Sequence, residues 1–454
     1  MLTENRNHSF TQPLYIKHVI LILLLSIWAA TCPTFPSEAV LEFGFTSEFT
    51  DIAENIENLA FYGSTLPDGT IYPDVRREPL YPAALFVARS LFKHYTGLVY
   101  IQITLLVLTF YMWGVYLYRK YGQLSSIFFV IFLFAAPIPT FYGSVLYPYA
   151  LNFFFLSSSL LSLISGIQKQ KAGYFILSGI LCASAVYERG IYLFLPIFII
   201  IVLLLFRKNF NIHTKNLGYY FAAFMLVLAP WLVRNYNHGT VGMNQMMGYT
   251  LGYTYGMHPS ISESQYSRLF DQYMVQYDDT DKASLKFLNH LMTVEKKSYI
   301  EADSILTSLV VEKIRSNPIR VPVTVIKNTL ALPARLVDPG IRFTTYETPL
   351  DYYLESLTSN TPKLLDFIVF FLSLFGLVYL SRRVDLLAIL SLSVLIYTYP
   401  FITAITLFDP RYRGVSDIII YAFASQGLGV MYQTITLKLQ KKGSEKKRGM
   451  QNEY

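Results

Sequence analysis

The 454-residue sequence is poor in charged residues and contains two cysteines. Charged residues make up 15% of the chain, whereas soluble domains contain about a quarter, so the composition argues against a soluble protein. The cysteines, Cys32 and Cys182, both lie in or beside apolar segments. They imply no disulfide framework, and neither thiol chemistry nor a zinc site can be built from them.

Sequence motifs for common cofactors are also missing. The chain has no GxxxxGK[ST], GxGxxG, GxSxG or HExxH pattern, so nucleotide hydrolysis, dinucleotide binding and zinc proteolysis have no support. His94, His238, His258 and His290 never fall at metal-ligand spacing. The acidic run at 278–281 lacks the glycine and the distal glutamate of an EF-hand, which favours a solvated loop. We therefore expect neither a bound metal nor another cofactor.

Long apolar runs are the dominant feature of the chain. Hydrophobic residues make up 53% of it, and runs of about 17 to 25 residues recur, each long enough to cross about 30 Å of hydrocarbon as a helix. The first run, 15–31, is too long for a signal-peptide core and lacks a small-residue cleavage site, so we expect a retained span. The sequence predicts about ten transmembrane helices. They lie near 15–34, 97–118, 124–139, 147–167, 174–187, 190–206, 217–233, 363–381, 384–407 and 414–437.

Basic residues occur in every second loop between these spans and in the tail from Lys438 to Arg448. Because cytoplasmic loops are enriched in Lys and Arg, we expect a multi-pass protein of the inner (plasma) membrane with both termini in the cytoplasm. The net charge of +7 is explained better by this membrane topology, and by contact of the tail with anionic lipid head groups, than by a nucleic-acid partner.

Two long segments fall on the outer side in this topology. The first, 35–96, has helical patterns near 48–62 and 80–93, and the second of these is typical of a helix lying in the membrane interface. The other segment, 235–362, is polar and helical from about 260 to 316. The predicted organisation is a seven-helix module that includes the first outer loop (1–234), an outer helical loop (235–362), C-terminal transmembrane helices (363–437) and a basic cytoplasmic tail (438–454).

Four carboxylates follow the first predicted span. Glu48, Asp51, Glu54 and Glu57 are spaced by three, which places them on one side of a helix that begins near Thr50. One interpretation is a solvated acidic face, since acids favour helix N-termini. The other is a general base at the membrane surface, which would accept the proton of an attacking hydroxyl group. Their position within one or two turns of a span end favours the second interpretation.

Arginines are frequent on the predicted outer side, where Lys and Arg are usually rare. Each of them alone could extend to lipid head groups. Together they favour a pocket for phosphate oxygens, because a guanidinium group binds phosphate through parallel hydrogen bonds and stabilises a departing phosphate. These residues are Arg76, Arg77, Arg189, Arg234, Arg411 and Arg413.

Most of these residues belong to five short motifs spread in order along nearly the whole chain. The motifs are Glu48-Phe-Thr-Asp51 with Glu57-Asn58-Leu59 and Gly63, Arg77-Glu-Pro-Leu-Tyr-Pro82, Ser178-Gly179 through Glu188-Arg189, Ala229-Pro-Trp-Leu-Val-Arg234-Asn235-Tyr236, and Asp409-Pro-Arg-Tyr-Arg413. Together they resemble the motifs of membrane glycosyltransferases with the GT-C fold. The resemblance is to the bacterial branch grouped with protein O-mannosyltransferases and the lipid A aminoarabinose transferase.

This resemblance implies an all-α polytopic GT-C bundle with an extracytoplasmic first loop and a larger extracytoplasmic helical loop. It also implies inverting transfer of a sugar from a polyprenyl-phosphate donor to a glycan, lipid or protein acceptor on the extracytoplasmic face. The catalytic carboxylate would be Glu48 or Asp51. The expected phosphate ligands are Arg77, Arg189, Arg234, Arg411 and Arg413, and the expected pocket residues are Tyr81, Trp231 and Tyr412.

The sequence departs from the family pattern at two places. Glu48 stands where the first acidic motif usually begins with aspartate, and Tyr147-Pro148-Tyr149 stands where a second acidic residue often opens the fourth span. We therefore predict neither a metal nor a second carboxylate in the site.

Two other functions fit a polytopic protein that handles lipid-linked sugars. A transporter or flippase usually has paired halves and ionisable groups at mid-membrane, whereas the charges here gather at the outer edge. An envelope polymerase or ligase acting on preassembled glycans would use similar chemistry on different substrates.

Overall fold

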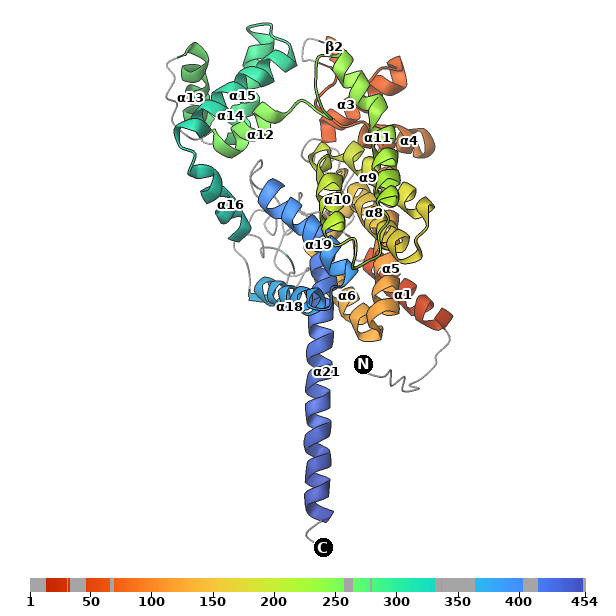
Figure 1. Cartoon of the computed structure of the whole chain (residues 1–454). Coiled ribbons are helices and arrows are strands. Elements are labelled where there is room, and N and C mark those ends of the chain that lie inside the picture. Colours follow the sequence, from red (N-terminus) through yellow and green to blue (C-terminus); the bar gives the residue numbers. More distant parts are fainter. Residues whose placement is uncertain are drawn as a thin grey trace.

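The computed structural model describes a chain that is almost entirely helical. It describes residues 14–30, 32, 46–65, 69–256, 264–277, 280–330, 336, 364–402 and 415–451. Within these residues the only sheet is the antiparallel hairpin of β1 (Gly63–Thr65) and β2 (Ile71–Pro73). Figure 1 shows a helical bundle with two groups of short helices at one end and the long helix α21 projecting from the other. The all-α architecture predicted from the sequence is confirmed.

Several bundle helices have the properties of membrane spans. Those that are long and apolar enough to cross a membrane are α5 (Gly97–Tyr121), α8 (Tyr149–Lys169), α11 (Thr214–Asn237), α18 (Leu364–Ser381) and the part Ser416–Gln440 of α21 (Val415–Gln451). The other bundle elements are α1 (Leu14–Ala30), α6 (Gln123–Ala135), α7 (Pro137–Ser144), α9 (Ala172–Glu188), η1 (Gly190–Tyr192), α10 (Leu195–Leu205), α19 (Leu386–Ile396) and η2 (Tyr397–Ile402). The chain is a polytopic membrane protein.

The described helices do not confirm the predicted count of about ten spans, and short or broken helices explain the difference. Both α10 and α19 have 11 residues, a length of about 17 Å, which is well below about 30 Å of hydrocarbon. α6 and α7 pass the length test only as a pair, and this pair is bent by 60°. The break lies at Ala136, whose backbone is extended, because Pro137 disfavours the helical conformation of the residue before it. With this pair counted as one span, the described helices give up to six spans.

Two groups of short helices form the end of the molecule that the sequence predicts to lie on the outer side. The first outer loop folds into α3 (Thr46–Leu59), the β1–β2 hairpin and α4 (Leu80–Phe92), so helices occur at both places predicted near 48–62 and 80–93. The second group, here called the outer helical domain, comprises α12 (Met247–Tyr255), α13 (Gln265–Tyr277), α14 (Thr280–Thr293), α15 (Tyr299–Ser316) and α16 (Arg320–Leu330).

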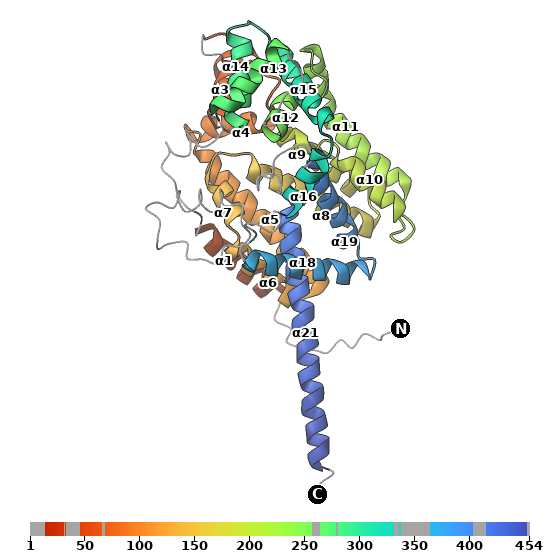
Figure 2. The same ribbon diagram turned by 90° about the vertical axis from the view of Figure 1, so that its left-hand side faces the viewer.

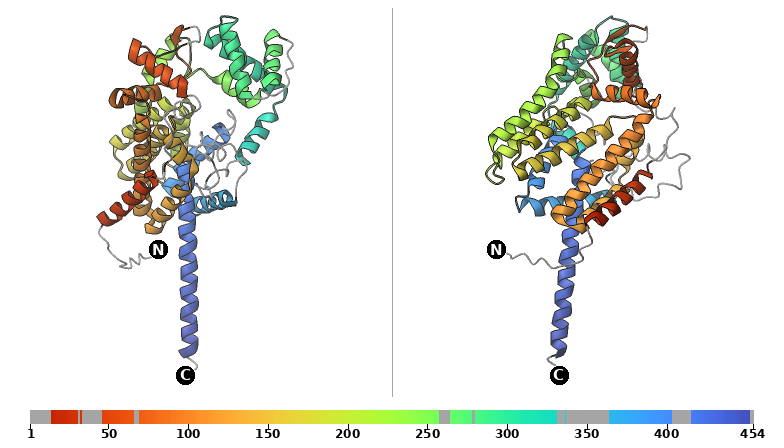
Figure 3. Two further views of the ribbon diagram at one scale, coloured as in Figure 1. Left: turned by 180° about the vertical axis from the view of Figure 1, so that it is seen from behind. Right: turned by 90° about the vertical axis from the view of Figure 1, so that its right-hand side faces the viewer.

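The outer helical domain is attached to the first outer loop by specific contacts. The backbone N–H of Gln245 donates to the carbonyl oxygen of Val75 at 2.7 Å. The Gln245 side chain donates to the buried carboxylate of Asp303 on α15 at 2.9 Å, and Val75 is part of the apolar core of this domain. Figures 2 and 3 show both groups of helices at the same end of the bundle from other sides.

The bundle helices α18 and α21 approach each other closely at two glycines. A Cβ atom added at Gly376 of α18 would collide with the carbonyl oxygen of Phe423, and one added at Gly427 of α21 would collide with that of Leu372. Small residues at such positions allow the backbones of two membrane helices to meet.

We predict that Gly376→Ala lowers the unfolding temperature of the detergent-solubilised protein, because the added methyl group separates two backbones and overpacking costs about 1–3 kcal/mol. Gly218→Ala on α11 is the matched control, since its Cβ would meet open space and alanine favours the helix. Equal unfolding temperatures of the two variants would contradict the prediction.

Candidate active site

The organising residue of the candidate site is Asp74, in the turn between β2 and α4. Its buried carboxylate accepts hydrogen bonds from the Ser64 hydroxyl at 2.5 Å and from the backbone N–H groups of Arg76 and Arg77, both at 2.8 Å. The Arg76 side chain also donates to it at 3.2 Å. Burial alone would raise the pKa of Asp74, but Arg76, Ser64 and the backbone donors together hold this pKa below its usual value. The turn therefore fixes the direction in which both arginines leave the backbone.

Glu48, on the first turn of α3, meets these two arginines. Its Oε2 atom accepts hydrogen bonds from Arg77 Nε at 2.9 Å and Nη2 at 2.7 Å, and Arg76 Nη1 lies 3.8 Å away. Burial alone would raise the pKa of Glu48, but the charges of Arg77 and Arg76 bring it below its usual value. The Glu48 side chain keeps 24% of its surface exposed. Glu48 is therefore an ionised carboxylate that remains open on one side.

The other carboxylates of α3 have different partners. Asp51 accepts a hydrogen bond from the backbone N–H of Thr65 at 2.7 Å, so it binds the β1 strand. Glu54 and Glu57 both form ion pairs with Arg89 of α4, at 3.2 and 3.1 Å, on the exposed side of the loop. Of the four carboxylates that the sequence placed on one helix side, the described residues show an ion pair to Arg76 or Arg77 only for Glu48.

Arg234, in the last turn of α11, joins the bundle to the first outer loop. Its guanidinium donates to the carbonyl oxygens of Asp74 at 2.5 Å and Tyr62 at 3.0 Å. It also lies over the rings of Trp231 at 4.6 Å and Tyr62 at 5.1 Å. The Trp231 indole donates in turn to the carbonyl oxygen of Met243 at 3.0 Å. These contacts hold Arg234 and Trp231 beside the Asp74 turn.

Arg189, which follows α9, lies near the same turn through its neighbour Gly190. The Gly190 backbone N–H donates to Glu78 Oε1 at 2.6 Å, and the Asn244 side chain donates to the same oxygen at 2.7 Å. The Arg189 guanidinium lies 5.0 Å from the centre of the Tyr147 ring. Burial raises the pKa of Glu78 above its usual value, although the Gly190 hydrogen bond opposes this rise.

The remaining expected site residues lie elsewhere or outside the described residues. Tyr81 is buried, donates to Gln102 of α5 at 3.0 Å and packs edge-on against Phe49, so it supports the loop from within the core. Arg411, Tyr412 and Arg413 lie outside the described residues.

Sequence reasoning missed Asp74 and Glu78. Asp74 could have been found, because aspartate at the start of a turn often binds backbone N–H groups two or three residues later. No local pattern points to Glu78, whose partners Gly190 and Asn244 are more than a hundred residues away.

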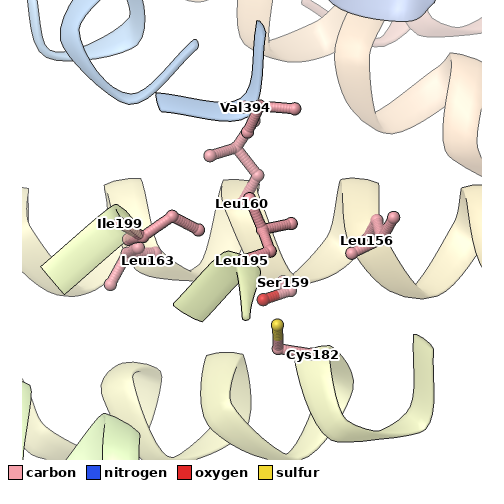
Figure 4. A pocket seen from close by; sticks show the side chains of 8 residues that line it. All are labelled: Leu156, Ser159, Leu160, Leu163, Cys182, Leu195, Ile199 and Val394. Carbon is pink, nitrogen blue, oxygen red and sulfur yellow. The ribbon is translucent and has the colours of Figure 1, made fainter. Parts of the chain in front are cut away.

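The described residues show no metal-binding group, and a small cavity among them lies apart from the charged cluster. Across the described part of the chain, no three His, Cys, Asp or Glu side chains lie close enough to hold a metal ion. Figure 4 shows a small, mostly apolar cavity between α8, α9, α10 and α19, next to Ser159 and Cys182. It has room for about one water molecule and shares no lining residue with the charged cluster.

Comparison with solved structures identifies the fold. The chain superposes on the oligosaccharyltransferase AglB from Archaeoglobus fulgidus, in complex with an inhibitory peptide and a dolichol-phosphate, with a TM-score of 0.51 and 13% sequence identity. The match covers 95% of this chain and 52% of that one. The chain has the GT-C fold. It spans about half the length of the oligosaccharyltransferase.

Other comparisons give an equal likeness, a weaker likeness or none. An Archaeoglobus fulgidus oligosaccharyltransferase in the apo form matches with a TM-score of 0.51. ArnT from Cupriavidus metallidurans matches with a TM-score of 0.39 at 13% identity over 91% of this chain and 78% of that one. No protein-family model and no curated protein sequence matches the chain.

We predict that Asp74→Ala destabilises the protein by about 3–5 kcal/mol, because it leaves Arg76 without its buried partner. Glu57→Ala is the control, since its ion pair with Arg89 is exposed and worth about 0–1 kcal/mol. Denaturant unfolding of the solubilised variants measures the difference. An Asp74→Ala protein as stable as the Glu57→Ala protein would show that the turn does not depend on this carboxylate.

The lowered pKa values of Glu48 and Asp74 predict a loss of stability in acid. Their contribution is fully present above the unfolded-state pKa values of about 4, and it disappears as the pH falls through the lower folded-state values. We expect the unfolding temperature to fall below about pH 4. The fall should be shallower in Asp74→Ala, which lacks one of the two carboxylates, and parallel curves would disprove this origin.

Proposed function

We propose that this protein is a membrane glycosyltransferase that moves a sugar from a polyprenyl-phosphate donor to an acceptor on the extracytoplasmic face of the inner membrane. The observation that carries this proposal is the ion-paired cluster of Glu48, Arg76 and Arg77 at the outer end of a GT-C bundle. A carboxylate and guanidinium groups in one partly exposed cluster supply both a proton acceptor and a phosphate ligand.

Glu48 is the proposed catalytic carboxylate. The acceptor hydroxyl oxygen attacks the anomeric carbon, the bond to the phosphate oxygen breaks and its electron pair leaves on the phosphate, and the hydroxyl proton passes to Glu48. The low pKa of Glu48 keeps it ionised at neutral pH. It is a weak base, which suffices when glycosidic bond breaking is far advanced in an oxocarbenium-like transition state.

The contacts of the two candidate carboxylates favour Glu48 over Asp51. Glu48 is paired with the arginines proposed to hold the donor. Asp51 accepts a hydrogen bond from the backbone N–H of Thr65 in β1. This contact gives Asp51 a structural role in holding the hairpin against α3.

Arg77 and Arg189 are the proposed ligands of the donor phosphate, with Arg411 and Arg413 as further candidates from the sequence. Their charge accelerates transfer only if it stabilises the departing phosphate more strongly than the bound donor. Arg234 already donates to Asp74 and Tyr62 carbonyl oxygens, so we assign it to positioning the turn. The AglB structure that shares this fold is a complex with a dolichol-phosphate, which supports a polyprenyl phosphate as donor carrier.

The acceptor is proposed to bind between the cluster and the outer helical domain. The Arg76 guanidinium lies 5.2 Å from the ring centre of Tyr299, the first residue of α15. The outer helical domain is therefore directly adjacent to the cluster. The C-terminal end of α21 lies at the opposite end of the molecule (Figure 1), which supports cytoplasmic placement of that terminus.

We predict that Glu48→Gln lowers transfer by about 10²- to 10⁴-fold, the usual contribution of a positioned acid or base, while Asp51→Asn keeps most of it. Glu54→Gln, which changes an exposed carboxylate on the same helix, is the matched control. The assay uses purified protein in nanodiscs, labelled polyprenyl-phosphate sugars and envelope lipids, glycans and peptides as acceptors.

Formation of a glycosylated product in nanodiscs, where no membrane potential exists, would exclude a transporter. Wild-type transfer by Glu48→Gln would remove this residue from the reaction, and failure to consume any polyprenyl-phosphate sugar would contradict the proposed donor.

A further inference from the structure

Glu188, the last residue of α9, is a buried carboxyl group that the proposed reaction does not use. The residue is 2% exposed. Both of its carboxyl oxygens are buried, and neither accepts a hydrogen bond from any described residue. An ionised carboxylate in such a position is strongly disfavoured, because it has lost water without gaining donors.

The surroundings of Glu188 add a like charge. Glu78 interacts with it from the segment before α4, Tyr81 from α4 and Arg189 from the next position in the chain. Glu78 is the stronger of the two charge influences on Glu188, and the Arg189 guanidinium extends over the ring of Tyr147. Two carboxyl groups that interact in a buried site do not both ionise near neutral pH.

Hydrogen bonding decides which member of the pair is ionised. Glu78 receives two donors, from Gly190 and Asn244, which stabilise its carboxylate. Glu188 receives none from the described residues. The hydrogen bonds therefore favour placing the proton of the pair on Glu188.

Glu78 in turn connects two of the arginines of the proposed site. It directly follows Arg77 in the chain, and its hydrogen bond to Gly190 reaches the residue that follows Arg189. The connection is close: a Cβ atom at Gly190 would lie 2.9 Å from Glu78 Oε1 and 3.0 Å from the Met243 side chain. The spacing between Arg77 and Arg189 thus depends on the Glu78–Gly190 contact.

We propose that Glu188 is a positioning residue that holds a proton beside Glu78, so that the pair carries one negative charge and Arg77 and Arg189 stay close enough to bind one phosphate group. Loss of this proton places two negative charges together and drives the segments apart. The phosphate-binding part of this inference rests on the proposed function, whereas the protonated state of Glu188 does not.

The first test needs no substrate. Infrared spectra of the full-length protein in nanodiscs at neutral pH are compared for wild type, Glu188→Gln and the exposed control Glu57→Gln. We expect the carbonyl stretch of an un-ionised carboxylic acid in wild type and Glu57→Gln, and its loss in Glu188→Gln. Absence of this band from wild type would show that Glu188 is ionised and would overturn the proposal.

The second test separates positioning from a purely structural role. Once the ionised form of Glu188 predominates, the KM for the donor should rise about tenfold for each further pH unit, since only the protonated form binds. The rise should be absent in Glu188→Gln, which cannot lose a proton, and present in Glu57→Gln. A structural role would lower the unfolding temperature of Glu188→Gln without changing the shape of the KM profile, and this result would overturn positioning.

The two tests also distinguish this inference from the proposed function. If the carboxylic acid band is present in wild type and lost in Glu188→Gln but no polyprenyl-phosphate sugar is turned over, the donor assignment fails while the protonated pair stands. Turnover with identical pH profiles in wild type and Glu188→Gln would mean that the donor assignment stands while the positioning role of Glu188 fails.

Discussion

The outer end of this protein depends on one buried carboxylate, that of Asp74. This carboxylate accepts hydrogen bonds from one hydroxyl group, two backbone N–H groups and one guanidinium group. The backbone carbonyl oxygen of Asp74 accepts a further hydrogen bond from Arg234 of α11. A buried charge is tolerated only when its hydrogen-bonding capacity is filled. Because this network is filled, Arg76 and Arg77 leave the turn in fixed directions and meet Glu48, and the first loop is locked to the bundle.

Features set by local periodicity were predictable from the sequence. The apolar runs predicted a polytopic helical bundle, and the first outer loop has helices at both predicted places, since each depends on residues three or four apart. The span count was less predictable. The number of spans depends on where each apolar helix ends. The break before Pro137 and the 11-residue length of α10 both reduce this number, and hydropathy alone predicts neither of them.

The candidate site was predictable in its residue types and only partly in its geometry. The spacing of Glu48 and Asp51 placed them on the same helix side and left the choice of catalytic residue between them open. The partner of Asp51 is a backbone N–H group on the β1–β2 hairpin, which no periodic sequence pattern predicts. Glu78 and Glu188 come within electrostatic range of each other because α9 packs against α4. Contacts between residues so far apart in the chain follow from the tertiary fold, which the sequence shares with AglB at 13% identity.

The unbroken helix α21 has a practical consequence for work with this protein. It runs for 37 residues, a rod of about 55 Å, nearly twice the thickness of about 30 Å of hydrocarbon. Its side chains are largely exposed from Met431 onward to the last residue whose burial is described, Gln440. A fluorophore or affinity label joined after Gln451 would therefore be held on a stiff stalk away from the bundle, far from the charged cluster at the other end.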